Sequence, residues 1–367
     1  MKKLLSLFVL IAIMMALTSC GGGYDPVANT EEEAQTVMTI KFEDKTYEVR
    51  YELYRALFLN LKSTVDGGDA SVWSGENKDE YIEEIDALIK ARVSDIYAVL
   101  HHAKKIGIDP YSKKYDEMVK EYIQVSVDGG YYYNGIKIEG FGKDYAKYLA
   151  YLKSVNLNYS VQDLLLRYSQ AMEDIFYYYA GRTGEFLEDV TPGKLQYTRE
   201  DVEAFYNSGD CVRVIRGFWE KRYCTAEQAE KYRKGMMDVS YSEDSIVNYI
   251  SGKMLNIGGL GDGEIYAKYN LDTFQYAEEI KAAFATDMFE VSGVIEVSTV
   301  NEEGYAILYR AAKTTQHFEK CYDKIATAYV HNEVGKIIDT AAAEMLESIT
   351  FSSYLTNMNR GEISMED

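Results

Sequence analysis

The sequence predicts an α+β protein: a mainly helical lobe, built from an N-terminal segment and a long C-terminal helix, with an α+β domain inserted between them. Apolar and polar residues alternate from Val37 to Val49, and apolar residues then recur every three or four positions as far as Ala180. Alternation returns after Cys211, before a last long helical stripe. The expected segments are a signal peptide (1–19), a flexible tether (20–36), the helical lobe (37–197), a linker helix with the α+β domain (198–313), a C-terminal helix packing on the lobe (314–350) and an acidic tail (351–367).

The first twenty residues have the features of a lipoprotein leader. Lys2 and Lys3 precede an apolar run that ends at Leu17 and is shorter than the roughly 20 residues needed to span a bilayer. Leu17-Thr18-Ser19-Cys20 has the form of a bacterial lipobox, so Cys20 is the expected lipidation site. The expected location is the extracytoplasmic face of a bacterial cell membrane. The alternative is an ordinary secretory peptide in which Cys20 is incidental.

The helical lobe is expected to open with a β-hairpin that turns at Glu43. Apolar stripes and capping residues then predict five helices. They cover Tyr51 to Leu61, Tyr81 to Ile106, Pro110 to Gln124 with Asp109 as N-cap, Asp144 to Lys153, and Ser160 to Ala180 with a capping box from Ser160 to Asp163. The glycine- and tyrosine-rich stretch from Asp128 to Gly142 is expected to be a loop with a short ribbon.

The second half changes from helical to mixed patterning. Thr198 and Thr225 each begin a capping motif, and the intervening Val212 to Trp219 is typical of a strand. Further expected elements are a tight turn at Gly258 to Gly261, a helix from Tyr276 to Phe284, strands at Val291 to Val297 and Tyr305 to Tyr309, and one closing helix whose apolar stripe runs from Phe318 to Met345. We expect these elements before the closing helix to form one compact domain.

Composition excludes several classes of protein. A net charge of -20 argues against binding nucleic acid or anionic lipid by charge. P-loop, GxSxG, HExxH and CxxC motifs are missing from the sequence, so no metal or cofactor is expected. Beyond Cys20 there are three cysteines, and whether Cys211 and Cys224 pair is left open by the odd Cys321. The 34 tyrosines indicate either contact surfaces for peptides or sugars, or tyrosine replacing Phe and Leu at half-buried positions.

Several collinear motifs resemble one family. They are Ile40 to Tyr47, Tyr197 to Tyr206, Ala226 to Glu230, Gly258 to Gly261, Tyr276 to Phe284 with Val291 to Val294 after it, and Gly304 to Leu308. In this order, after a lipobox, the chain resembles the foldase lipoproteins and periplasmic chaperones of the SurA and PrsA kind over nearly its whole mature length. The resemblance implies a SurA-like helical chaperone lobe and a parvulin-type peptidyl-prolyl isomerase domain.

The same resemblance locates a degenerate site. Parvulins carry paired histidines on the first and last strands, where this sequence has Arg216 and Ala306. An arginine only donates hydrogen bonds and an alanine side chain makes none, so neither replaces an imidazole. The positions implied to bind substrate are Tyr276, Ile280, Phe284 and Leu260, and no catalytic residue is identified.

The expected function is therefore that of a membrane-anchored extracytoplasmic chaperone, or foldase, which binds unfolded exported polypeptides and isomerises prolines weakly or not at all. Two alternatives stay open. One is an active peptidyl-prolyl cis-trans isomerase, because a dry, shaped pocket alone lowers the rotation barrier. The other is a peptide- or glycan-binding lipoprotein that uses the tyrosines at Tyr131 to Tyr133 or Tyr177 to Tyr179.

Overall fold

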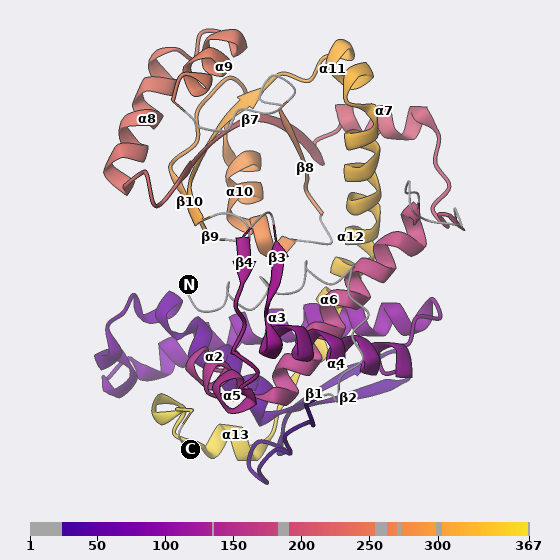
Figure 1. The fold of residues 1–367 in the computed structure, drawn as a ribbon, viewed down its shortest axis with the longest axis vertical. Coiled ribbons are helices and arrows are strands. Elements are labelled where there is room, and N and C mark those ends of the chain that lie inside the picture. The colour runs from indigo at the N-terminus through magenta and orange to yellow at the C-terminus, as the bar shows by residue number, and fades with distance from the viewer. Residues whose placement is uncertain are drawn as a thin grey trace. The chain divides into compact units, whose positions relative to one another are not determined.

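The computed structural model describes residues 24–133, 136–182, 191–253, 263–269, 273–298 and 303–365. The chain divides into two compact units (Figure 1). The first contains the residues up to Asp174 together with those from Ile338 onward, and the second contains Ile175–Ile337. Helices α6 and α12 each contribute residues to both units. The fold is mixed α+β, as expected, with antiparallel sheets.

The first unit is mainly helical and opens with the predicted hairpin. Its strands pair in antiparallel register around a turn in which Glu43 has φ of 50°. The elements are β1 (Thr36–Phe42), β2 (Lys45–Arg50), α2 (Tyr51–Asp66), η2 (Ala70–Ser74), α3 (Lys78–Lys105), α4 (Lys113–Asp128), β3 (Tyr131–Tyr133), β4 (Ile136–Ile138), α5 (Tyr145–Ser154), α6 (Tyr159–Ala180), β11 (Thr350–Phe351), α13 (Ser353–Asn357) and η4 (Arg360–Glu362).

Two predicted helix starts in this unit are wrong. Helix α4 begins at Lys113 because Asp109 instead closes a turn, accepting a hydrogen bond from the backbone of Tyr111 at 3.1 Å. Ser160 does not cap α6, since the Asn158 side chain accepts the bond from the backbone of Val161 at 2.9 Å. The short ribbon after α4 is present as β3 and β4. A Cβ atom at Gly129 would lie 2.1 Å from the backbone oxygen of Glu139, just after β4, so the close approach requires glycine.

The N-terminal segment is not a free tether from residue 24 onward. We call residues 24–35 the strap. The Tyr24 ring stacks on Tyr145 at 4.8 Å, and its hydroxyl donates to Asp128 at 2.9 Å. Further along, backbone carbonyls of the strap accept hydrogen bonds from the first two backbone N–H groups of α2. These contacts satisfy helix donors that Arg50, the N-cap residue, leaves without a side-chain acceptor.

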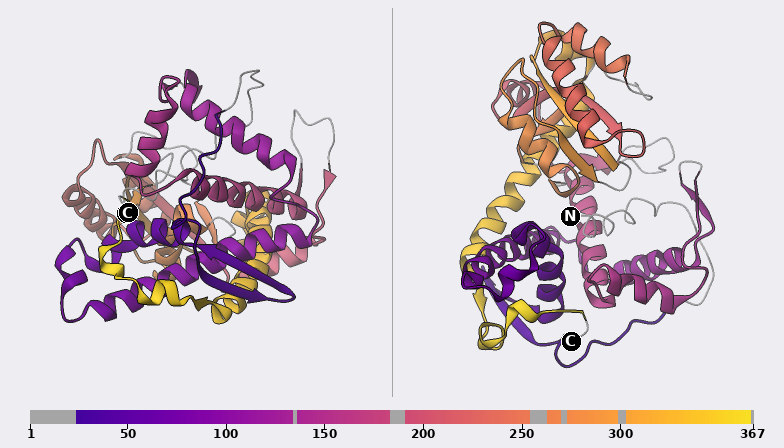
Figure 2. Two further views of the ribbon diagram at one scale, coloured as in Figure 1. Left: turned by 90° about the horizontal axis from the view of Figure 1, so that it is seen from below. Right: turned by 90° about the vertical axis from the view of Figure 1, so that its left-hand side faces the viewer.

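The segment expected to be an acidic tail is also folded onto the first unit. Strand β11 pairs with β1 along the hairpin, where Figure 2 shows the yellow C-terminal segment beside the indigo strands. Leu355 is fully buried, and Arg360 forms an ion pair with Asp86 on α3. Asp86 also accepts a hydrogen bond from Tyr54 at 2.8 Å. The tail therefore completes the core of this unit.

The second unit contains a four-stranded antiparallel sheet in the order β8-β7-β10-β9. Helices α8 and α9 pack against one face, and α10 packs against the other (Figure 1). The elements are β5 (Gly181–Arg182), β6 (Thr191–Pro192), α7 (Arg199–Asn207), β7 (Cys211–Glu220), α8 (Ala226–Asp238), α9 (Glu243–Ser251), β8 (Glu264–Ala267), α10 (Thr273–Ala285), β9 (Ile295–Ser298), β10 (Glu303–Ala311), α11 (Thr315–Lys320) and α12 (Tyr322–Ser348).

The predicted capping motifs of this unit are confirmed, since Thr198 and Thr225 each form a reciprocal capping box. The prediction of a single closing helix is wrong. The final helix is broken at Cys321 into α11 and α12, and Ile337, expected on its buried stripe, is 41% exposed. Cys211, Cys224 and Cys321 are buried, unpaired thiols. In the ranges that the structure describes, no helix is long and apolar enough to cross a membrane.

Candidate functional site

The two degenerate positions lie on neighbouring central strands of the second unit. In the β7–β10 register, Leu308 faces Arg216 and Ala306 faces Phe218. Ala306 is fully buried in the apolar layer between the sheet and α10. The structure therefore places Arg216 and Ala306 on paired strands, with one residue pair of the ladder between their positions.

Arg216 is held by a bidentate ion pair. Its Nε donates to Oε2 of Glu279 at 2.6 Å, and a terminal nitrogen donates to Oε1 at 2.9 Å. Tyr266 donates to the same carboxylate at 3.1 Å, and the guanidinium lies 4.8 Å from the centre of the Phe218 ring. Glu279 is only 2% exposed. Burial, and then the Glu279 carboxylate, raise the pKa of Tyr266 well above its ordinary value. We call Arg216, Glu279 and Tyr266 the Arg216 network.

This arrangement occupies the surface on which the resemblance places a proline pocket. In a bidentate guanidinium–carboxylate pair the hydrogen-bond donors and acceptors are directed at each other. Few of them are therefore left to form hydrogen bonds with a ligand. Ile280 is buried at 6% exposure, and Phe284 is half-buried against the same apolar layer. Two of the predicted positions, Leu260 and the proposed lipidation site Cys20, lie outside the described residues. The structure also does not describe the side chains of Tyr276 and of Tyr131 to Tyr133.

A hollow site lies instead in the first unit, and we call it the cavity. Its volume is about 630 Å³. The wall combines tyrosine and aliphatic side chains with seven charged ones. It is contributed by the strap, the end of β2, the start of α2, α3, α4 with the loop before it, and α6: Pro26, Val27, Glu48, Arg50, Glu52, Leu53, Tyr97, Tyr111, Asp116, Val119, Lys120, Tyr159, Ser160, Val161, Asp163, Leu164 and Arg167. The wall is therefore mixed in polarity, and its volume lies in the range of clefts that bind ligands.

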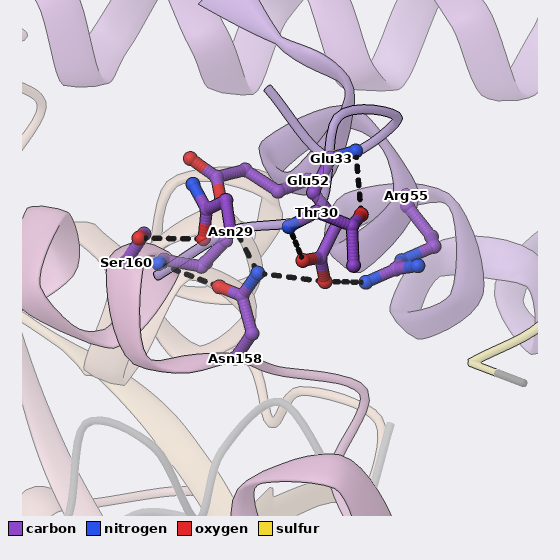
Figure 3. A network of polar contacts seen from close by, with 8 residues as sticks. Asn29, Thr30, Glu33, Glu52, Arg55, Asn158 and Ser160 are labelled. Atoms are coloured by element: carbon purple, nitrogen blue, oxygen red, sulfur yellow. Dashed lines mark hydrogen bonds and ion pairs between the residues drawn. The ribbon is translucent and has the colours of Figure 1, made fainter. Parts of the chain in front are cut away.

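A polar network fixes the strap along this wall (Figure 3). Ser160 donates to the side chain of Asn29 at 2.8 Å, joining the start of α6 to the strap. The amide of Asn158 donates to Glu33 at 3.1 Å and to Glu52 at 3.2 Å, so one side chain connects the strap, α6 and α2. The strap is thereby a structural part of the cavity.

The two glutamates of this network differ in their counter-charges. Burial alone would raise the pKa of Glu33, but hydrogen bonds from Thr30, Asn158 and Arg55 lower it overall. Arg55 donates to Glu33 at 2.5 Å. Glu52 is 7% exposed and lines the cavity. Its burial raises its pKa even though the hydrogen bond from Asn158 and the charges of Arg50 and Arg55 oppose the shift. Within the described part of the chain, the hydrogen bond to its carboxylate comes from a neutral amide.

Arginine and tyrosine already contact each other on the cavity wall. Arg167 donates to Asp163 at 2.7 Å and to Asp116 at 2.8 Å, so two carboxylates neutralise it. Burial would lower its pKa, but these two carboxylates raise it overall. Its guanidinium also lies 5.5 Å from the centre of the Tyr111 ring. The ring of Tyr111 is 51% exposed.

Sequence reasoning missed the cavity. The tyrosine excess did not locate it, because many tyrosines are fully buried in the core and because Tyr97, Tyr111 and Tyr159 are dispersed over three segments. Tyr177 to Tyr179, the cluster that we could locate, is half-buried near the end of α6. Among the residues that the structure describes, no group of His, Cys, Asp and Glu is arranged to hold a metal ion.

Comparisons with known proteins give distant similarities. No protein-family model matches the chain, and no curated protein matches it. Among solved structures, the foldase protein PrsA from Streptococcus pneumoniae is similar at 13% identity and a TM-score of 0.22, over 84% of this chain and 92% of that one. The foldase protein PrsA from Lactococcus lactis is similar at 11% identity and a TM-score of 0.23, over 90% of this chain and 99% of that one. Likeness at this distance assigns no role to any residue of this chain.

Proposed function

We propose that this chain is a chaperone, anchored to the extracytoplasmic face of the membrane through lipid on Cys20, that holds segments of unfolded exported polypeptides in the cavity of its first unit. The observation that carries the proposal is the cavity itself: about 630 Å³ lined by tyrosine, aliphatic and charged side chains. Unfolded chains expose apolar side chains next to unsatisfied peptide groups, and such a mixed wall offers partners for both.

The anchor and the cavity are close in the chain. The strap starts at Tyr24, four residues after Cys20, and its Pro26 and Val27 line the cavity. A lipid on Cys20 would keep the cavity close to the membrane surface, where exported chains emerge unfolded. Reversible capture there separates aggregation-prone segments without ATP.

We propose further that proline isomerisation by the second unit is weak or absent. The rotation barrier of roughly 18–20 kcal/mol is lowered by a pocket that holds the twisted amide better than the planar one. In this chain the corresponding layer contains the Arg216 network and the buried Ala306. A ligand entering it would have to break the Arg216–Glu279 ion pair.

Suppression of aggregation tests the chaperone function. The chain lacking residues 1–20 is mixed with a chemically denatured exported protein that aggregates on dilution, and light scattering is recorded without ATP. We expect suppression near equimolar ratios, and a weaker effect for Tyr111→Ser, which removes an exposed ring from the cavity wall. Tyr241→Ser is the matched control, because Tyr241 is 81% exposed and lies in the other unit.

Two outcomes of this experiment would overturn the proposal. One is no suppression at a large molar excess, and the other is an equal effect of both tyrosine variants. An isomerase assay on a proline tetrapeptide is run beside it. A rate that increases with protein concentration and is lost in Ile280→Arg would instead establish the active enzyme.

A further inference from the structure

We infer that the cavity selects polypeptide segments that carry a lysine or arginine, whose cationic end pairs with Glu52 against the tyrosine wall. The inference rests on the proposed function and specifies its substrate class. It starts from a carboxylate that is 7% exposed, lines a cavity and accepts its described hydrogen bond from a neutral amide. Burying a charge is costly unless a counter-charge accompanies it.

The other charged side chains of the cavity wall either form ion pairs within the protein or are exposed to solvent. Asp116 and Asp163 share Arg167. Glu48, Arg50 and Lys120 are exposed, so their charges are largely compensated by solvent. Arg55, one turn after Glu52, forms its described ion pair with Glu33, and its charge opposes the raised pKa of Glu52 without overcoming the effect of burial. Of the carboxylates on the wall, Glu52 is therefore the buried one that would gain most from a ligand's positive charge.

The rest of the wall suits the stem and the head of such a side chain. Leu53 and Val161 offer apolar surface for the methylene groups of lysine or arginine. Tyr97 and Tyr159 line the same wall, and a cation over a tyrosine ring is attracted by its electron-rich face. Arg167 over Tyr111 at 5.5 Å is an example of this contact within the cavity.

The charge of the whole protein favours the same ligands. A net charge of -20 raises the local concentration of basic segments and speeds their association, particularly at low salt. That long-range effect is screened over about 8 Å at physiological ionic strength, whereas a pair formed with buried Glu52 is screened much less. The preference should therefore persist at high salt.

Peptide binding tests the inference. Two fluorescent nonapeptides with the same apolar and tyrosine residues carry either Lys or Gln at the centre, and their binding to the chain lacking residues 1–20 is measured by anisotropy in high salt. We expect the Lys peptide to bind at least about tenfold tighter, as a charge-assisted hydrogen bond allows. Glu52→Gln should abolish this difference, whereas Glu48→Gln, which removes the same charge from an exposed wall position, should keep it.

The possible outcomes distinguish a failure of this inference from a failure of the proposed chaperone function. Equal binding of both peptides to the unsubstituted chain refutes the inference and leaves the chaperone proposal standing. Equal losses in Glu52→Gln and Glu48→Gln also refute it, because they would assign the effect to general charge. If neither peptide binds and aggregation is not suppressed, the proposed function itself fails. The preference of the unsubstituted chain is measured without any variant, so reduced stability of Glu52→Gln does not prevent the test.

Discussion

The cavity of the first unit and the α10-covered sheet face of the second unit handle buried charge in opposite ways. In the second unit, Glu279 is 2% exposed and receives two hydrogen bonds from Arg216 and one from Tyr266. In the first, Glu52 is 7% exposed and receives its described hydrogen bond from Asn158. The sequence predicts a site on the α10-covered sheet face, which the Arg216 network occupies. It gives no prediction of the cavity in the first unit. The comparison therefore contrasts a buried carboxylate that a guanidinium contacts directly with one that lines a cavity and accepts its described hydrogen bond from an amide.

Removing one partner from the Arg216 network should have the largest effect. Glu279→Gln removes the carboxylate charge that pairs with the Arg216 guanidinium in a buried layer, and should lower the free energy of unfolding of the second unit by about 3–5 kcal/mol. Urea unfolding reports this through Trp219 fluorescence in a Trp73→Phe background, because Trp219 is in the second unit and Trp73 in the first.

The control for Glu279→Gln is an exposed pair on the same unit. Arg222→Gln disrupts the ion pair between Arg222 and Glu220, whose side chains are 68% and 46% exposed, and should leave the urea midpoint almost unchanged because solvent screens this pair. Equal midpoints for Glu279→Gln and the unsubstituted chain would show that the Arg216 network does not stabilise the layer.

The C-terminal segment of the first unit offers the next test. Arg360→Gln removes the counter-charge of Asp86, which is 7% exposed, and leaves Tyr54 as a described donor to it. We expect a loss of about 2–3 kcal/mol in the first unit, followed by Trp73 fluorescence in a Trp219→Phe background. Lys78→Gln removes an exposed contact to Asn359 on the same segment and should change little. A smaller loss for Arg360→Gln than for Lys78→Gln would mean that the tail does not depend on this pair.

Asp95 extends the comparison to a second carboxylate of the first unit whose pKa is raised by burial. Burial, only partly offset by Arg92, raises the pKa of Asp95 to about 6. A carboxyl whose folded pKa is raised stabilises the fold below its unfolded pKa of about 4 and loses this contribution as the pH rises through 6. Asp95→Asn should therefore stabilise the first unit by about 1.5 kcal/mol at pH 7.5, after discounting for partial exposure, and by almost nothing at pH 4. Urea midpoints at the two pH values measure this, and a pH-independent gain would contradict it.

The smallest expected effect is that of introducing a histidine at Arg216. Arg216→His places an imidazole on β7 but leaves Ala306 on β10 and removes the guanidinium that pairs with Glu279. We expect no detectable acceleration of cis-trans exchange in a proline tetrapeptide. A clear acceleration would mean that the layer is a latent isomerase pocket that the Arg216–Glu279 pair merely blocks.

Local chemistry explains what could be predicted from the sequence. The hairpin turn at Glu43 and the capping boxes begun by Thr198 and Thr225 are as expected, because each depends on residues within a few positions of one another. The α+β class was predictable for the same reason, since the period of the apolar pattern is a local property. Strand β8 and helix α9 were missed, because their apolar patterns are short.

The partners of buried charges and the walls of the cavity were decided only by the tertiary structure. Arg216 is separated from Glu279 by 63 residues, and Arg360 from Asp86 by 274. The strap and the C-terminal segment are polar enough to be expected outside the core, yet stacking of Tyr24 and burial of Leu355 fix them to the first unit. The caps and the periodicity are properties of neighbouring residues and follow from the sequence alone. Which carboxylate finds a guanidinium, and which is left facing a cavity, depends on contacts between distant segments that only the folded chain brings together.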